Sequence, residues 1–166
     1  MAVAIDQEVV DHDYQGAPKR ILVFGTLDSG FSNAAADLFP GALQGALAQC
    51  GVQTEVYAPN HLQLNPEDRL RSMIARFKPD TVLLIHQSVQ ASMNGQVHSG
   101  TYTLTLKDIA TKHDIWSAIM RLSGPSDLIE DRSKGASMFA DRIVNRLATE
   151  GVLKACPAAI TAPRSS

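Results

Sequence analysis

The sequence predicts an α/β fold, in which a parallel sheet is covered by helices on both faces. Short apolar runs alternate along the chain with segments whose apolar residues recur at helical spacing. One of these runs, residues 81–85 (TVLLI), is apolar on both faces, which is typical of a central parallel strand between two helix layers. The length of 166 residues fits one domain.

The first half of the chain predicts two strands with a helix between them. Residues 21–24 (ILVF) end at Gly25 and indicate a buried strand. Pro40 fits the first turn of a helix, and Gly51 fits the position just after that helix ends. Residues 52–57 alternate as a second strand does.

The second half predicts three helices around the third strand and one further strand. The pair Asn65-Pro66 opens a helix that Lys78-Pro79 ends. Residues 101–106 alternate and are expected at a sheet edge. Thr111 and Asp114 resemble a capping box, which predicts a helix through Leu122. The last helix is expected from roughly Gly135 to Glu150.

Composition bounds the rest of the organisation. Residues 1–18 are expected to be a flexible segment, residues 19–153 a single α/β domain, and residues 154–166 a flexible tail. Cys50 and Cys156 lie far apart without metal-ligand spacing, so neither a disulfide framework nor a metal site is indicated, and a reducing cytoplasm is expected. No cofactor is indicated. A net charge of -2 disfavours nucleic acid, and no apolar run is long enough to cross a membrane.

In a parallel sheet, ligands bind beyond the carboxyl ends of the strands, which here selects residues 25–33, 58–63 and 86–94. The first loop allows three interpretations. Its GxxxxG spacing is that of a phosphate loop, but Phe31 occupies the position of the phosphate-binding lysine. Ser29 is placed as a nucleophile would be, between a strand and a helix. The same residues also fit a simple glycine-rich turn.

Four segments together resemble the SGNH/GDSL hydrolases, a family of esterases and lipases with a three-layer α/β/α flavodoxin-like fold. They are residues 20–25 (RILVFG), 56–60 (VYAPN), 75–85 (ARFKPDTVLLI) and 135–143 (GASMFADRI). The resemblance implies a short parallel sheet of that type. It also implies hydrolysis of a small-molecule ester by a serine nucleophile.

The resemblance assigns a role to individual residues. Ser29 becomes the nucleophile and Asp131 the residue that orients the base. Lys134 stands where the family has its histidine, so His86, at the end of a central strand, is the substitute base. Asn60 and Gln90, by their place in the second and third conserved blocks, become the donors to the oxyanion.

Two other functions stay open at this point. A relative that has lost catalysis would bind a small ligand or a protein. An unrelated flavodoxin-like or Rossmann-like domain would bind an anion or nucleotide at the first loop. Because the interval between Ile85 and Gly135 is short, the sheet is expected to expose an edge, through which a homo-oligomer or a protein partner could form.

Overall fold

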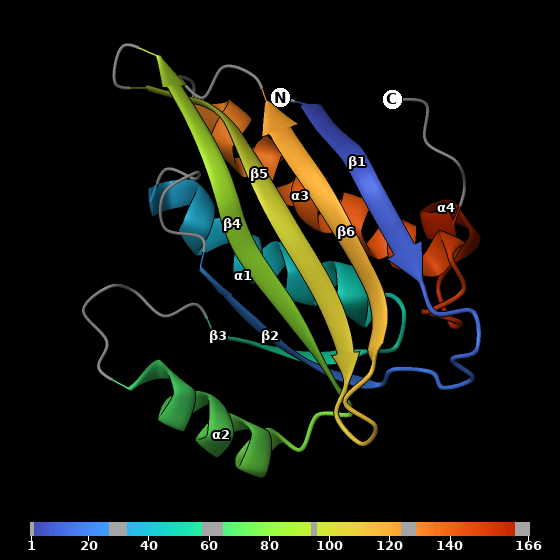
Figure 1. Cartoon of the computed structure of the whole chain (residues 1–166). Helices are drawn as coiled ribbons and strands as arrows, with labels where there is room; N and C mark the ends of the chain where they lie inside the picture. Colours follow the sequence, from blue (N-terminus) through green and yellow to red (C-terminus); the bar gives the residue numbers. More distant parts are fainter. Residues whose placement is uncertain (1, 27–32, 58–64, 94–95, 124–128, 162–166) are drawn as a thin grey trace.

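A computed structural model describes residues 2–26, 33–57, 65–93, 96–123 and 129–161. In these segments six strands and four helices follow one another along the chain (Figure 1). The strands are β1 (Ala2–Val10), β2 (Arg20–Thr26), β3 (Gln53–Tyr57), β4 (Thr81–Met93), β5 (Gln96–Asp108) and β6 (Asp114–Ser123). The helices are α1 (Asn33–Ala48), α2 (Pro66–Phe77), α3 (Ile129–Thr149) and the short α4 (Ala158–Thr161).

The strands form one mixed sheet in the order β1-β6-β5-β4-β2-β3. Only β2 runs parallel to its neighbours β3 and β4, whereas β4, β5, β6 and β1 pair antiparallel. The expectation of a short parallel sheet is therefore wrong for most of the strand pairs. The fold has α+β character, and the structure does not confirm a three-layer flavodoxin-like arrangement.

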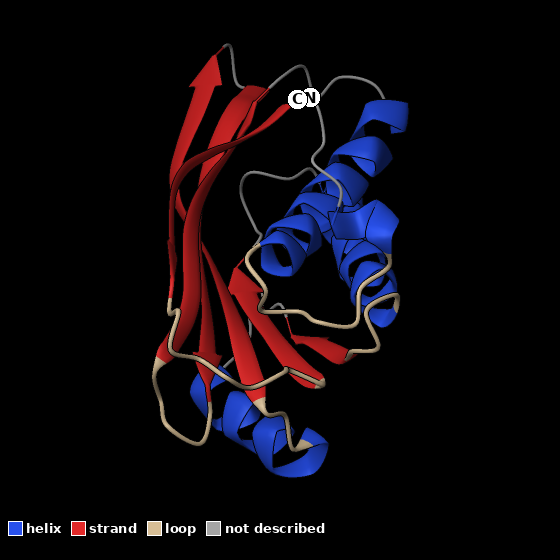
Figure 2. Ribbon diagram, turned by 90° about the vertical axis from the view of Figure 1, so that its right-hand side faces the viewer, coloured by secondary structure: helices blue, strands red, loops and turns tan. Residues whose placement is uncertain are grey.

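The core lies between one face of the sheet and the helix pair α1 and α3 (Figure 2). The rings of Phe39 in α1 and Phe139 in α3 stack with centroids 5.1 Å apart, and Tyr102 of β5 lies 5.3 Å from Phe139. On the other face, α2 covers a smaller cluster around Leu22 and Phe77. The remaining part of that face, over β5 and β6, carries no helix among the described residues (Figure 1).

Helix α1 and helix α2 show where capping rules hold and where they fail. Helix α2 begins at Pro66 as expected, although the Asn65 side chain makes no capping hydrogen bond. Pro40 lies inside α1 instead of in its first turn, because the helix already begins at Asn33. Gly51 has a φ of 72°, which fits a glycine in the turn that follows α1.

Residues 2–10 of the N-terminal segment, which was expected to be a flexible lead-in over residues 1–18, form strand β1. Strand β1 pairs along its whole length with β6, and its register is shifted between Ile5 and Gln7. That bulge interrupts the alternation of apolar and polar residues by which a strand is recognised in a sequence. The pairing also places the first strand of the chain beside the last one, and local sequence patterns do not reveal such a contact between distant residues.

Strands β4, β5 and β6 form a long antiparallel meander. Strand β4 continues to Met93, so the expected ligand loop 86–94 is largely strand. Strand β5, with the expected edge residues 101–106, lies between β4 and β6 in the interior of the sheet. The helix predicted from Thr111 to Leu122 is also wrong. Residues 114–123 are β6, and the Thr111 backbone and hydroxyl both donate to Asp108 Oδ2 in the turn before it.

The C-terminal segment is tied to the domain at two points. Cys50, just after α1, forms a disulfide with Cys156, which corrects the expectation that the spacing of the two cysteines indicates no disulfide. The side chain of Asn145 in α3, which is 3% exposed, donates a hydrogen bond of 2.5 Å to the carbonyl oxygen of Ile160 in α4. Residues 154–161 therefore belong to the packed domain and not to a free tail.

Candidate functional site

Four of the five residues predicted from the hydrolase resemblance have no described side chain. Ser29 and Asn60 lie outside the described residues altogether. Asp131 lies in the first turns of α3 and Gln90 in the outer half of β4, where it pairs with Gly100. Their assignment as nucleophile, orienting acid and oxyanion donors stays a prediction.

The fifth residue, His86, is exposed on β4 between Thr26 of β2 and Thr103 of β5. Its neighbour Ile85 is 3% exposed and belongs to the core that α1 and α3 cover. Because successive side chains of a strand point to opposite faces, His86 faces away from the helix layer that contains α3. The structure thus places His86 and the helix of Asp131 on opposite sides of the sheet.

Gly25, which ends the predicted first strand, has a packing role in the structure. It pairs with Ile85 of β4, and a Cβ atom at this position would lie 3.1 Å from both the Cβ and the carbonyl oxygen of Ile85. A contact of that length is shorter than ordinary van der Waals separation. The close approach of β2 and β4 accounts for this glycine without a phosphate or a nucleophile beside it.

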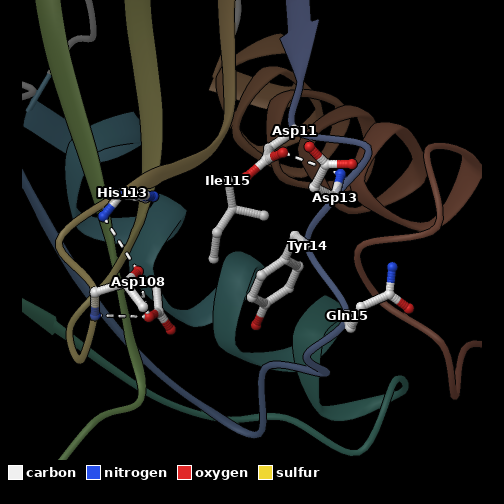
Figure 3. Close-up of a pocket in the computed structure, with 8 residues that line it drawn as sticks. Asp11, Asp13, Tyr14, Gln15, Asp108, His113 and Ile115 are labelled. Carbon is white, nitrogen blue, oxygen red and sulfur yellow. Dashed lines mark hydrogen bonds between the residues drawn. The ribbon is translucent and has the colours of Figure 1, made fainter.

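A pocket of about 270 Å³ lies at the end of the sheet where β1 and β6 meet the turn after β5 (Figure 3). Two segments that are distant in sequence form its walls. Asp11, Asp13, Tyr14 and Gln15 come from the connection between β1 and β2, and Asp108, Thr111, His113 and Ile115 come from β5, the following turn and β6.

Short backbone contacts fix the two walls relative to each other. The Asp11 backbone N–H donates to the carbonyl oxygen of Ile115 at 2.8 Å, which continues the pairing of β1 with β6 by one residue. The Asp11 carboxylate then accepts the Asp13 backbone N–H at 3.0 Å, a local turn typical of aspartate. Asp108 stabilises the opposite turn in the same way. Both carboxylates therefore have a structural role in shaping the pocket.

The lining of the pocket is acidic. It holds three aspartates and, among the described residues, no lysine or arginine. Burial raises the pKa of the Tyr14 phenol, and the carboxylates of Asp108 and Asp80 raise it further. A cationic side chain would be the favourable occupant of such a pocket. In the part of the chain that the structure describes, no group of three or more His, Cys, Asp or Glu side chains could hold a metal ion.

A second polar cluster connects the edge strand β1 to α3. Glu8 accepts hydrogen bonds from Arg146 Nε at 3.0 Å, from Arg146 Nη2 at 2.6 Å and from Trp116 Nε1 at 3.2 Å. Arg146 Nη2 also donates to Glu150 at 2.5 Å. Sequence reasoning missed this cluster because Glu8 fell in the segment assigned as flexible. Only Arg146 and Glu150, four residues apart, form a pair that a sequence can show.

Comparison with solved structures places the fold. The PelC dodecamer of Paraburkholderia phytofirmans matches with a TM-score of 0.53 and 14% identity, covering 88% of this chain and 97% of that one. A PelC variant from the same organism, also a dodecamer, matches with the same TM-score and coverage at 13% identity. A Xanthomonas campestris protein of the DUF330 family gives a TM-score of 0.49 at 11% identity, covering 86% of this chain and 91% of that one.

Comparisons of the sequence identify no family for this chain. No family model matches the chain, and no curated protein matches it either. Separately, no helix within the described segments is long and apolar enough to cross a membrane.

These findings overturn the hydrolase interpretation. The fold is shared with PelC and not with the SGNH/GDSL hydrolases, and no family model supports the latter. The four segments that carried the resemblance are a strand, a strand end, a helix with its following strand, and part of a helix, which many sheets with packed helices contain. Neither the hydrolase family nor ester hydrolysis follows from the structure, and the fold of this chain is the one seen in PelC.

Proposed function

We propose that this protein is a subunit of a homo-oligomeric assembly and acts as a structural or interaction protein. The observation that carries the proposal is the fold match to PelC over 97% of the PelC chain, since the matched PelC structures are dodecamers. At 13–14% identity the match concerns the fold, so the assembly of this chain is inferred from its surfaces.

The shape of the sheet supports this proposal. The sheet is open, with β1 at one edge and β3 at the other. A subunit whose two edges differ can contact the next copy head to tail, which is the kind of contact that closes a ring. In addition, the face of β5 and β6 away from the core carries no helix within the described segments. That face is available for contact with another copy.

The test is the mass of the protein in solution. We expect sedimentation velocity and light scattering of the full chain to give a particle several times the mass of the 17.9 kDa chain, and the particle to dissociate on dilution. Crosslinking at low concentration should give a ladder of multiples of one chain. A monomer at every accessible concentration would refute the proposal.

The cellular compartment is also a proposal. The sequence predicts the cytoplasm, but the disulfide between Cys50 and Cys156 favours an oxidising compartment, where such bonds persist. We infer that the chain folds in an oxidising environment. Thiol labelling of the denatured protein, taken directly from its source cells, should find both cysteines blocked until a reductant is added. Two free thiols would favour the cytoplasm instead.

A further inference from the structure

We propose that one copy of this protein contacts the next through complementary charges: the acidic surface formed by Asp11, Asp13 and Asp108 binds the outward face of α2 on a second copy. This inference rests on the proposed function, because it names the surfaces that join the subunits. It assigns the pocket of Figure 3 an occupant, namely the arginine side chains of the neighbouring α2.

The charges of the chain are unevenly distributed. Its first 18 residues hold four carboxylates and no lysine or arginine, whereas helix α2 and Lys78 directly after it hold four cations against two carboxylates, Glu67 and Asp68, in the first turn of the helix. Part of each set is neutralised within the chain: Asp6 pairs with Arg121, Glu8 with Arg146, and Arg76 with Glu55. The charges that are left without a partner in the chain determine how two copies attract each other.

The acidic surplus lies at the pocket. Within the described segments Asp11 and Asp13 form no ion pair, and the Asp11 side chain accepts a hydrogen bond from the Asp13 backbone. Asp108 accepts hydrogen bonds from the uncharged Thr111 and, among the described residues, forms no ion pair. The three carboxylates surround one pocket, so a cation that enters it interacts with all of them at once.

The basic surplus lies on α2. Leu70, Met73 and Ile74 turn toward the sheet, which leaves the arginines on the exposed side. Arg69 is exposed and has no ion pair in the part of the chain that the structure describes. Arg71 has only a 3.8 Å contact with Asp68, and its side chain is 79% exposed. Such an exposed pair contributes little and leaves Arg71 available to a partner.

Helix α2 and the connection that follows β1 lie at the same end of the sheet but on different sides of it (Figure 1). Helix α2 packs beneath β2 and β4, next to the β3 edge, while Asp11 and Asp13 follow β1 at the opposite edge. Two acidic surfaces, or two α2 helices, would repel each other if they met. The charges therefore favour a head-to-tail contact over a symmetric pair, and such contacts repeat from copy to copy.

The first experiment reverses each surface separately and measures assembly by sedimentation velocity. We expect Arg69→Glu/Arg71→Glu and Asp11→Lys/Asp13→Lys each to raise the dissociation constant of the assembly about 100-fold. The single variant Asp13→Lys, which keeps the Asp11 turn, should raise it in the same direction. Lys134→Glu changes the net charge as much as Arg69→Glu does, but at an exposed site on α3, and should leave assembly unchanged.

The second experiment mixes the two double variants. In a head-to-tail contact, a reversed α2 meets a reversed pocket and an original α2 meets an original pocket, so the mixture should assemble although each variant alone does not. Far-ultraviolet circular dichroism on each variant verifies the fold. Variants that assemble as the wild type does, or a mixture that stays dissociated, would overturn this inference while leaving the oligomer intact. A monomeric wild type would instead refute the proposed function.

Discussion

Arg146 of α3 holds Glu8 of β1 with two parallel hydrogen bonds, from Nε at 3.0 Å and from Nη2 at 2.6 Å. The two residues are 138 positions apart in sequence, and both side chains are mostly buried, at 23% and 13% exposure. Two-pronged pairs of this kind are stronger than single contacts and fix orientation. The pair therefore attaches the first strand of the chain to the helix layer, at an edge that backbone pairing secures from one side only.

Replacing Glu8 by glutamine should destabilise the protein by about 2–3 kcal/mol, because Arg146 would lose the carboxylate that accepts two of its hydrogen bonds in a partly buried site and keep only Glu150 as a charged partner. Asp6, two residues earlier, provides the control. Its pair with Arg121 is exposed, at 40% and 52%, so Asp6→Asn should cost less than about 1 kcal/mol. Urea denaturation at neutral pH measures both variants. An equal loss of unfolding free energy in the two variants would show that burial of the pair between Glu8 and Arg146 does not increase its contribution to stability.

The same cluster predicts how stability depends on pH. Burial alone would raise the pKa of Glu8, but its hydrogen bonds with Arg146, Glu150 and Trp116 together hold it below the ordinary value. A carboxylate with a lowered pKa stabilises the fold above its unfolded pKa of about 4.3, and this contribution disappears as the pH falls through the folded value. The fluorescence of Trp116, the one tryptophan of the chain, should report the loss in acid. Glu8→Gln should lack this acid-side transition.

The pKa of Glu150 is shifted in the opposite direction to that of Glu8. Its hydrogen bond with Glu8, then burial and the charge of Glu8, raise the pKa of its carboxyl above the ordinary value. A raised carboxyl pKa gives stability that is complete below the unfolded pKa and declines as the pH rises through the folded one. Glu150→Gln should therefore flatten the stability profile on the neutral side of about pH 4.3, the ordinary pKa of glutamate. Urea denaturation at a series of pH values measures this profile, and a steeper decline in the variant would contradict the assignment.

The fold could be predicted where its information is local. Helices α2 and α3 and strands β2 and β3 could each be predicted from a proline, a glycine or an apolar run within a few residues. The structure of the segment around Trp116 could not be predicted in this way, because its apolar residues fit both the period of a helix and that of a strand. Ile115, Ile119 and Leu122 follow helical spacing, whereas Trp116, Ala118, Met120 and Leu122 alternate and are buried in the core as strand residues. The segment is a strand because it pairs with β5 on one side and β1 on the other.

The candidate site was less predictable still. Strand ends were expected to converge at 25–33, 58–63 and 86–94, but this rule holds for parallel strands, and β4 instead continues into an antiparallel hairpin. The pocket arises where residues 11–15 meet the turn after Asp108, segments without a shared motif. Four carboxylates in the first 18 residues were visible in the sequence. Their proximity to that turn depends on the pairing of β1 with β6.

Gly25→Ala should destabilise the protein by about 1–3 kcal/mol, because the new methyl group would lie 3.1 Å from Ile85 in the neighbouring strand and force β2 and β4 apart. Gly41→Ala is the matched control. No atom lies within 4 Å of a Cβ at that position inside α1, so alanine should stabilise the helix by about 0.5–1 kcal/mol. Thermal denaturation should shift the two melting temperatures in opposite directions. A neutral Gly25→Ala would mean that the strands accommodate the methyl group.

Reduction of the disulfide should destabilise the protein by about 2–5 kcal/mol, because the bond joins cysteines separated by 106 residues and so closes a long loop in the unfolded chain. The double variant Cys50→Ser/Cys156→Ser should show the same loss without reductant and no further change with it. Denaturation in the presence and absence of dithiothreitol measures both. Local effects should be strongest at α4, whose Ile160 packs against the core, so amide exchange there should accelerate before exchange in the sheet. Equal stability of the oxidised and reduced proteins would mean that packing of residues 154–161 alone, including the bond from Asn145 to Ile160, holds the C-terminal segment in place.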